Sequence, residues 1–166
     1  NSNSRSNNRA IINNGIGNIV NSSTVDSTIQ NENVITTSES NFDSLINNGT
    51  FNSKNDMFTG NVIDNSGTLN IENTTIDSYV DNKDNSKFFV KGGKIFKIDG
   101  SENSEISIQK YTDNSNNEIL TTINSVFLSG DSILNFYDGT ISRETNAYIT
   151  LYGDSIFNFY NGTIST

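Results

Sequence analysis

Two stretches near the end of the chain decide the fold: residues 128–142 read LSGDSILNFYDGTIS, and residues 151–165 read LYGDSIFNFYNGTIS. The second stretch repeats the first, with Leu151 in the place of Leu128, and 12 of the 15 aligned positions are identical. Self-similarity at a fixed spacing is the signature of repeat architectures, in which each unit packs on its neighbours. The chain is therefore expected to be an array of similar units.

Weaker copies of this unit run upstream. Residues 69–77, LNIENTTID, align with residues 134–142, and residues 88–96, FFVKGGKIF, follow the same pattern with Lys in place of Thr. Units start near positions 18, 51, 69, 88, 106, 134 and 157, so the steps after position 51 are 18, 19, 18, 28 and 23. The gap between positions 18 and 51 has room for one more, so about eight units are expected.

Apolar and polar residues alternate within a unit. Leu69 and Ile71 point to one side, and Asn70 and Glu72 to the other, which is typical of a strand with one buried face. No stretch has the i, i+3, i+4, i+7 apolar spacing of an amphipathic helix, so essentially no helix is expected. Because so short a unit buries its apolar side only by stacking, the prediction is an all-β, single-domain parallel β-solenoid. Residues 11–166 form this domain, after a disordered tail or linker at residues 1–10.

Stacking of successive coils about 4.8 Å apart places equivalent residues on one another. Asn135 should then lie over Asn158, Phe136 over Phe159, and Tyr137 over Tyr160. The commonest step, 18, also suits left-handed hexapeptide helices, but those need strict six-residue phasing. The i, i+2 inward pairs and the variable unit length favour a right-handed parallel β-helix.

Composition narrows the possible functions of these 166 residues. Only 32% are hydrophobic, whereas 30 are Asn, 23 Ser and 17 Thr. His, Cys, Pro and Trp are absent, which excludes Cys/His zinc sites, haem attachment, cysteine nucleophiles and a catalytic histidine. The net charge of −9 argues against a nucleic-acid partner, and no apolar run reaches the length of a membrane span.

Residues 65–77, NSGTLNIENTTID, and 153–165, GDSIFNFYNGTIS, resemble the repeats of right-handed β-helix surface proteins. These include bacterial adhesins, autotransporter passenger domains and filamentous-haemagglutinin-like exoproteins. The resemblance extends over most of the chain and implies an extracellular or cell-surface protein with a structural or adhesive role. It is a resemblance of pattern, so no functional residue is carried over from those proteins.

Three aspartates are the candidates for chemistry. Asp131 and Asp154 occupy the same position of consecutive units, so their carboxylates should lie within about 5 Å, and Asp138 is on the same unit as Asp131. Such a pair suits a retaining glycosidase or a calcium ion. The alternative, which we favour, is a solvated corner in which Asp serves turn geometry. We therefore expect no catalytic residues and no cofactor, with a calcium ion at Asp131 and Asp154 as the weaker alternative.

Two further clusters are candidate binding surfaces. The first is basic and would contact an acidic partner, or it is a solvated strand face or a row of positive residues along an edge. The second is made of tyrosines in the last two units, which could stack on sugar rings, pack on a neighbouring molecule, or form a surface stack. The basic cluster consists of Lys83, Lys87, Lys91, Lys94 and Lys97, and the aromatic one of Tyr137, Tyr148, Tyr152 and Tyr160.

The ends of the solenoid are the candidate assembly site. The chain begins with Asn rather than Met, and its last repeat is followed by nothing that resembles a cap, so we expect a processed product, a fragment, or an open end that docks on another molecule. A subunit with complementary open ends polymerises head to tail. Residues 9–20, RAIINNGIGNIV, are apolar enough to be the acceptor. The candidate assembly residues are Ile11, Ile12, Asn135, Tyr137, Ile156, Phe157, Asn158, Phe159, Tyr160 and Ile164.

The sequence thus favours a non-enzymatic structural protein outside the cell, a head-to-tail homo-oligomer that forms or decorates a filament, fibre or adhesin. The first alternative is a carbohydrate-cleaving β-helix of the tailspike or lyase kind, using Asp131, Asp138 and Asp154. The second is a binding module for glycans or ice. Ice binding is disfavoured because regular Thr columns are lacking.

Overall fold

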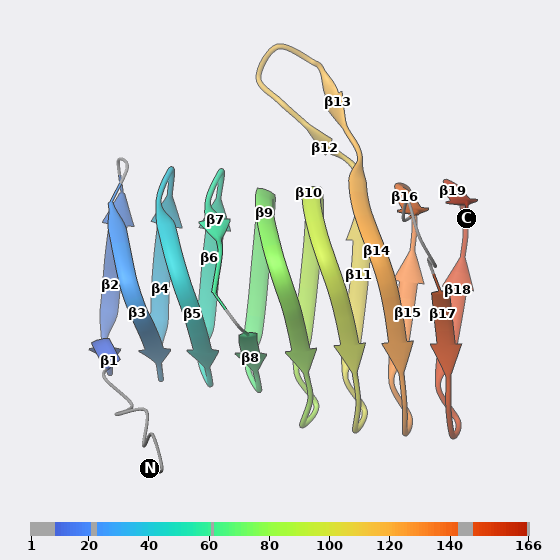
Figure 1. The fold of residues 1–166 in the computed structure, drawn as a ribbon, viewed down its shortest axis with the longest axis horizontal. Coiled ribbons are helices and arrows are strands. Elements are labelled where there is room, and N and C mark those ends of the chain that lie inside the picture. The colour runs from blue at the N-terminus through green and yellow to red at the C-terminus, as the bar shows by residue number, and fades with distance from the viewer. Residues whose placement is uncertain (1–8, 21–22, 61, 143–147, 166) are drawn as a thin grey trace, which may run out of the picture.

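The computed structural model describes residues 9–20, 23–60, 62–142 and 148–165. In these residues the chain winds as a parallel β-solenoid of about seven turns, and β18 (Ile156–Phe159) and β19 (Thr163–Ser165) begin a further turn (Figure 1). The farther strands run up the page and the nearer strands run down while the chain advances from left to right, so the coil is right-handed (Figure 1). The predicted all-β solenoid is confirmed, and the estimate of about eight units included the incomplete turn.

Each turn has two sides, which we call side A and side B. Side A, on the far side of Figure 1, is a ladder of parallel strands in which each strand pairs with the equivalent strand one turn away. Its strands are β2 (Ile16–Val20), β4 (Val34–Ser38), β6 (Thr50–Lys54), the first half of β9 (Thr68–Asn82), the first half of β10 (Lys87–Gly100), β11 (Glu105–Gln109), β15 (Ile133–Phe136) and β18.

Side B is the nearer ladder, and it bends midway along each strand. Its pairing shifts register in several turns, for example between Ile95 and Lys97, which marks that bend. Its first strand begins at Arg9, inside the predicted tail, and residues 1–8 of that tail lie outside the described residues. Side B consists of β1 (Arg9–Asn13), β3 (Thr24–Asn31), β5 (Asn41–Asn47), β7 (Met57–Phe58), β8 (Val62–Asn65), the second halves of β9 and β10, β14 (Thr121–Leu128), β16 (Thr140–Ser142), β17 (Tyr148–Leu151) and β19.

A short hairpin leaves the solenoid between β11 and β14. Strands β12 (Tyr111–Thr112) and β13 (Glu118–Ile119) pair antiparallel and project beyond the upper ends of the coils (Figure 1). The hairpin accounts for the longest step between repeats, because its residues are added to one turn without disturbing the ladders on either side of it.

The register of side A shows why the repeats align as they do. One column of inward residues takes one member from each unit, and the predicted starts at 51, 69, 88, 106, 134 and 157 all lie in it. The unit predicted in the gap is β4, which contributes Ile35, and the first member is Gly17, one residue before the predicted position 18. The column is Gly17, Ile35, Phe51, Leu69, Phe88, Ile106, Leu134 and Phe157.

The core lies between the two sides along the whole axis. Side B contributes a second inward column of aliphatic residues, and the six members from Ile29 to Val126 are fully buried. Each strand needs an apolar residue only at alternate positions, where the side chain points inward. A chain with few hydrophobic residues therefore still builds a continuous core. This column is Ile11, Ile29, Leu45, Ile63, Val80, Ile98, Val126 and Ile149.

A buried column of asparagines supports the lower corner of the first turns. Asn13, Asn31, Asn47, Asn65 and Asn82 stack, and each Nδ2 donates a hydrogen bond of 2.6–2.8 Å to Oδ1 of the next asparagine. The first four also donate to backbone carbonyls at 2.9–3.0 Å, so their amide nitrogens are satisfied without water, whereas Nδ2 of Asn82, at the end of the column, is buried without a partner. The repeats alone predict amide stacking only at outward positions.

The asparagine column gives a test of where stability resides. Asn65→Ala should destabilise the fold by about 2–4 kcal/mol, because it leaves a donor on Asn47 and an acceptor on Asn82 buried without partners. Urea unfolding followed by circular dichroism measures the change. The matched control is Asn70→Ala on the outer surface, which loses one bond to Asn52 and should cost less than about 1 kcal/mol. Equal losses for the two variants would contradict the assignment.

The upper corner turns on a single residue with positive φ. Glu39 (φ 53°), Asn55 (φ 54°) and Asn73 (φ 47°) occupy this position in successive turns, and Gly92 (φ 67°) follows in the next. Asparagine and glycine adopt this left-handed conformation at a lower energetic cost than Glu.

Glu39→Asn should therefore stabilise the protein by about 0.5–1 kcal/mol, since the left-handed backbone is less strained with Asn. The shift in thermal midpoint checks it. Asn55→Glu, the reverse exchange one turn away, should destabilise by a similar amount. A gain from both exchanges would show that backbone strain is not what the corner selects against.

Candidate functional site

The exposed strand edges at the two ends are the first candidate site. Within the described residues, β1 and β2 pair on one side only, and so do β17, β18 and β19. Solenoid edges are normally blunted by charge, proline or a cap, yet neither β2 (IGNIV) nor β18 (IFNF) contains a charged residue.

The predicted assembly residues lie at these edges. Ile12 is 57% exposed at one end, and Ile156, Phe159 and Ile164 are 44–48% exposed at the other. Ile11 and Phe157 are partly buried against the core. The inward side chains of Phe159 and Ile164 are thus uncovered at the C-terminal end, whereas the exposed Ile12 and Ile156 occupy outward positions.

The predicted stacking of the last two turns is confirmed. Asn135 pairs with Asn158 in register, and Nδ2 of Asn158 donates to Oδ1 of Asn135 at 2.9 Å. Tyr137 and Tyr160 stack with ring centroids 4.8 Å apart and planes 5° from parallel, and Phe136 stacks on Phe159 at 5.6 Å.

This stacking changes the interpretation of the tyrosines. Tyr137 and Tyr160 each cover one face of the other's ring, and Tyr160 remains 60% exposed, so the pair is a surface stack with part of its area still open. Tyr152 is on the other side of the coil, where its ring contacts Phe127 at 5.3 Å, and Tyr148 begins β17 on that same side. The four tyrosines therefore form two separate groups.

The three candidate aspartates do not gather in one groove. Asp131 and Asp154 are exposed at the lower corner, one turn apart, and each follows a glycine with positive φ, Gly130 or Gly153. Asp138 is at the opposite end of β15, before Gly139. This corner spans four residues in each of the last turns, against two in the earlier ones, and the Gly-Asp-Ser sequence belongs to the longer form. The arrangement supports the turn-geometry interpretation.

The five candidate lysines are spread around the coil rather than joined in one patch. Lys83 is in the lower corner, Lys87 and Lys91 are on side A, and Lys94 and Lys97 are on side B. Three of them have carboxylate partners: Lys83 with Asp64 (2.9 Å) and Asp81, Lys87 with Glu105 (3.8 Å), and Lys97 with Asp99 (2.8 Å). Most of this charge is thus matched within the molecule, which favours the solvated-face interpretation.

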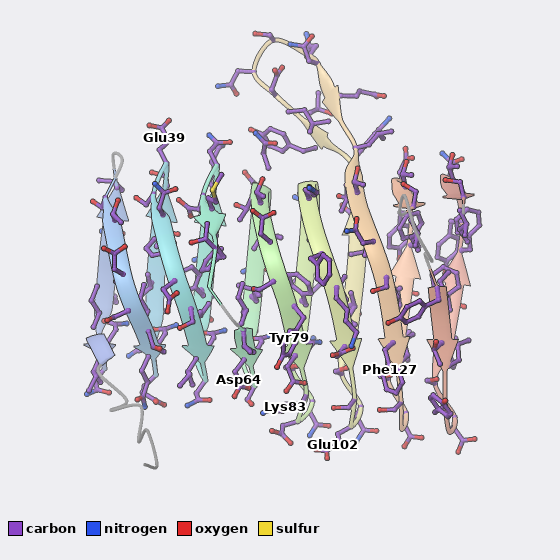
Figure 2. The ribbon with its side chains drawn as sticks, viewed as in Figure 1. Glu39, Asp64, Tyr79, Lys83, Glu102 and Phe127 are labelled. Atoms are coloured by element: carbon purple, nitrogen blue, oxygen red, sulfur yellow. The ribbon has the colours of Figure 1, made fainter. Side chains whose placement is uncertain are left out.

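A column of carboxylates accounts for the pairings of Lys83 and Lys97. Asp64, Asp81 and Asp99 stack on side B, and Lys83 bridges the first two (Figure 2 labels Asp64 and Lys83). Burial raises the pKa of Asp81, and Asp64 and Asp99 add to this against the effect of Lys83. The hydrogen bond to Asp64 raises the pKa of Lys83. Lys83 and Lys97 therefore neutralise part of a column of like charges.

A polar groove on side A was not predicted. Two hollows of about 310 and 240 Å³ lie along the axis and share Asn70 and Glu72. The larger is bounded by Phe89 and by Ser107, whose small side chain leaves space where the neighbouring turns carry Phe89 and Asn135. Its remaining lining includes Lys91 and Gln109. The signal available in the sequence was Phe89, an aromatic residue at an outward position.

The hairpin contacts Lys54, one of the residues that line the smaller hollow. Lys54 ion-pairs with Glu72 at 3.4 Å and lies 5.6 Å from the ring of Tyr111. Hydrogen bonds to Tyr111 and Glu72 raise the pKa of Lys54. A Cβ on Gly92 would lie 2.6 Å from Cβ of Tyr111, so glycine is needed for the hairpin to approach. The hairpin thus leans toward side A.

The comparisons with known proteins leave the fold as the basis for classification. No protein-family model matches the chain, and neither a curated protein nor a solved structure is significantly similar to it. No group of three metal-binding side chains occurs in the part of the chain that the structure describes, and no helix there could span a membrane. The fold defines the class: a single-domain parallel β-solenoid built from sequence repeats.

The carboxylate column predicts a pH effect. The folded-state pKa of Asp81 lies above its ordinary value of 3.8. Its carboxyl therefore favours folding while it is protonated, and this contribution is lost as pH rises through the folded-state pKa. Asp81→Asn should raise stability at pH 7, by less than about 1 kcal/mol because the site is solvent-screened, and leave stability at pH 3 unchanged.

Urea unfolding at both pH values measures this effect. Asp77→Asn, at an exposed position of the same strand, is the matched control and should change stability at neither pH. A loss of stability at pH 7 in Asp81→Asn would show that the pairing with Lys83 outweighs burial.

Proposed function

We propose that this chain is a non-enzymatic structural protein whose solenoid associates end to end to form or decorate a filament, fibre or adhesin outside the cell. The observation that carries the proposal is the pair of unpaired strand edges at which the core columns stop. Strands β2 and β18 carry no charged residue there, and the inward side chains of Phe159 and Ile164 are uncovered at the C-terminal end. A partner with the same cross-section and parallel strands would cover both the side chains and the backbone groups.

The rest of the molecule fits this role. Its ladders make a rod of about seven coils, which spans about 34 Å at 4.8 Å a coil. The extracellular or cell-surface location rests on the resemblance of the repeats to β-helix surface proteins. Asn, Ser and Thr on the outer columns keep the sides polar, so association is directed to the ends.

The proposal is tested by sedimentation and negative-stain microscopy of the chain at increasing concentration. Rods should lengthen in steps of about 35–40 Å, one molecule each. Ile164→Lys puts a charge on an inward column at the uncovered end and should weaken association at least tenfold. Thr163→Lys, at the adjacent outward position, is the matched control and should assemble normally.

Circular dichroism confirms that both variants are folded. Single short rods at every concentration, or equal effects of the two substitutions, would contradict end-to-end association.

A second candidate is carbohydrate binding, and the side A groove favours it over the aspartate corners. Phe89 offers an apolar ring beside Asn70, Glu72 and Gln109, the combination that holds a sugar by contact and hydrogen bonds. Titration with soluble polysaccharides of known composition tests it. We expect Phe89→Ser to abolish polysaccharide binding and Asp131→Asn to preserve it. The reverse pattern would show that the aspartate corners, and not the groove, bind the sugar.

A further inference from the structure

The two unpaired edges are complementary in register, and this complementarity identifies the partner and the residues that would pair. We infer that the C-terminal edge binds the N-terminal edge of a second copy so that Ile156 pairs with Ile16 and Asn158 with Asn18. The inference rests on the proposed end-to-end association and specifies its geometry. The partner is a second copy of this chain, and β18 of one copy and β2 of the next become neighbouring strands of one ladder.

The register follows from the columns of side A. Ile16 and Ile156 are the first and last members of one outward column, and Asn18 and Asn158 are the first and last of another. Adding a copy without a shift therefore continues every column by one coil. Asn158 already bonds Asn135 one turn below, and Asn18 would extend that amide stack.

Side-chain size is complementary at the inward position of the same strands. Phe157 ends the column that Gly17 begins, and Gly17 is the one member of that column without a side chain. A Cβ at Gly17 would make ordinary contacts of 3.4 Å or more with Asn13 and Ile35, so the position has space for a side chain that glycine does not fill. The ring of Phe157 would fill that space.

The stepped outline of the two ends also matches. The last turn contains a side A strand, β18, and the upper half of side B, β19. Among the described residues, the last strand in the lower half of side B is β17, which belongs to the turn before. At the other end, β1 occupies this lower half of side B, and no side A strand precedes it among the described residues. Strand β1 of the second copy would therefore complete the last turn, with Ile11 continuing the column of Ile149.

Charge agrees with this partner. Inner turns carry alternating charges on the outward positions of side A, as in Lys54, Glu72 and Lys91, and Lys54 ion-pairs with Glu72 across neighbouring coils. Strands β2 and β18 have no charged residue, so no like charges would face one another between these two strands. Backbone pairing and apolar contact then decide the register.

Disulfide trapping tests the register directly, because the chain contains no cysteine. Asn158→Cys protein is mixed with Asn18→Cys protein and oxidised gently. Neighbouring strands about 4.8 Å apart lie within the 4.4–6.8 Å Cα range of a disulfide. The mixture should give mainly the 158–18 heterodimer. The matched control replaces Asn18→Cys with Val20→Cys, two residues along the same strand and out of reach, and should give at least tenfold less.

A size swap provides the second arm. Gly17→Leu should weaken association at least tenfold by occupying the space of the Phe157 ring, and Phe157→Ala protein, offering its C-terminal edge, should restore binding to Gly17→Leu.

The outcomes separate the two proposals. Concentration-dependent rods with no preference for the 158–18 pair, or with 158–158 dimers, would overturn the register and leave end-to-end association in place. A failure of the chain to associate at all, measured on the cysteine-free protein, would overturn both.

Discussion

Everything in this molecule depends on parallel backbone pairing between consecutive coils. A single coil buries too little apolar surface to fold alone, so each turn is stable only when another turn of the same width lies against it. The pairing imposes a rule on the sequence: a residue must suit both neighbours in its column. Aliphatic and aromatic residues fill most inward columns. Some outward columns alternate charge or repeat amides, and the outward column of Asp64, Asp81 and Asp99 is partly neutralised by Lys83 and Lys97.

The buried asparagines follow from the same rule. A single buried amide would be costly, but in a column of amides at the coil spacing each member donates to the next, and only Nδ2 of the last one, Asn82, is left without a partner. The column begins at Asn13 and stops at Asn82, where Gly100 takes the next position and the corner lengthens from two residues to four. The chain thus uses two designs for one corner and passes between them without breaking the ladders.

Much of the fold could be predicted because two sequence signals agree. The repeat indicates which residues stack on one another, and the two-residue period indicates which of these stacks point inward. The last two units give their register outright, and Leu69 and Ile71 point inward as their alternation indicates. The inward asparagines were missed because nothing in Asn47 or Asn65 alone distinguishes a buried amide from a corner residue. The side A groove was missed because it depends on a small residue, Ser107, lying between larger ones on adjacent turns. The dispersal of the lysines was missed because the short segment from Lys83 to Lys97 passes from the lower corner over side A to side B. Lysines that are close in sequence therefore lie on different sides of the coil.

The central claim is that each coil is held by its neighbours on both sides, and amide hydrogen exchange tests it most directly. At low concentration, protection should be greatest in β9 and β10 and should fall toward β2 and β18. At concentrations where rods lengthen, β2 and β18 should become protected together while β9 and β10 change little. Equal protection along the whole chain, or end strands that stay unprotected within long rods, would contradict the account.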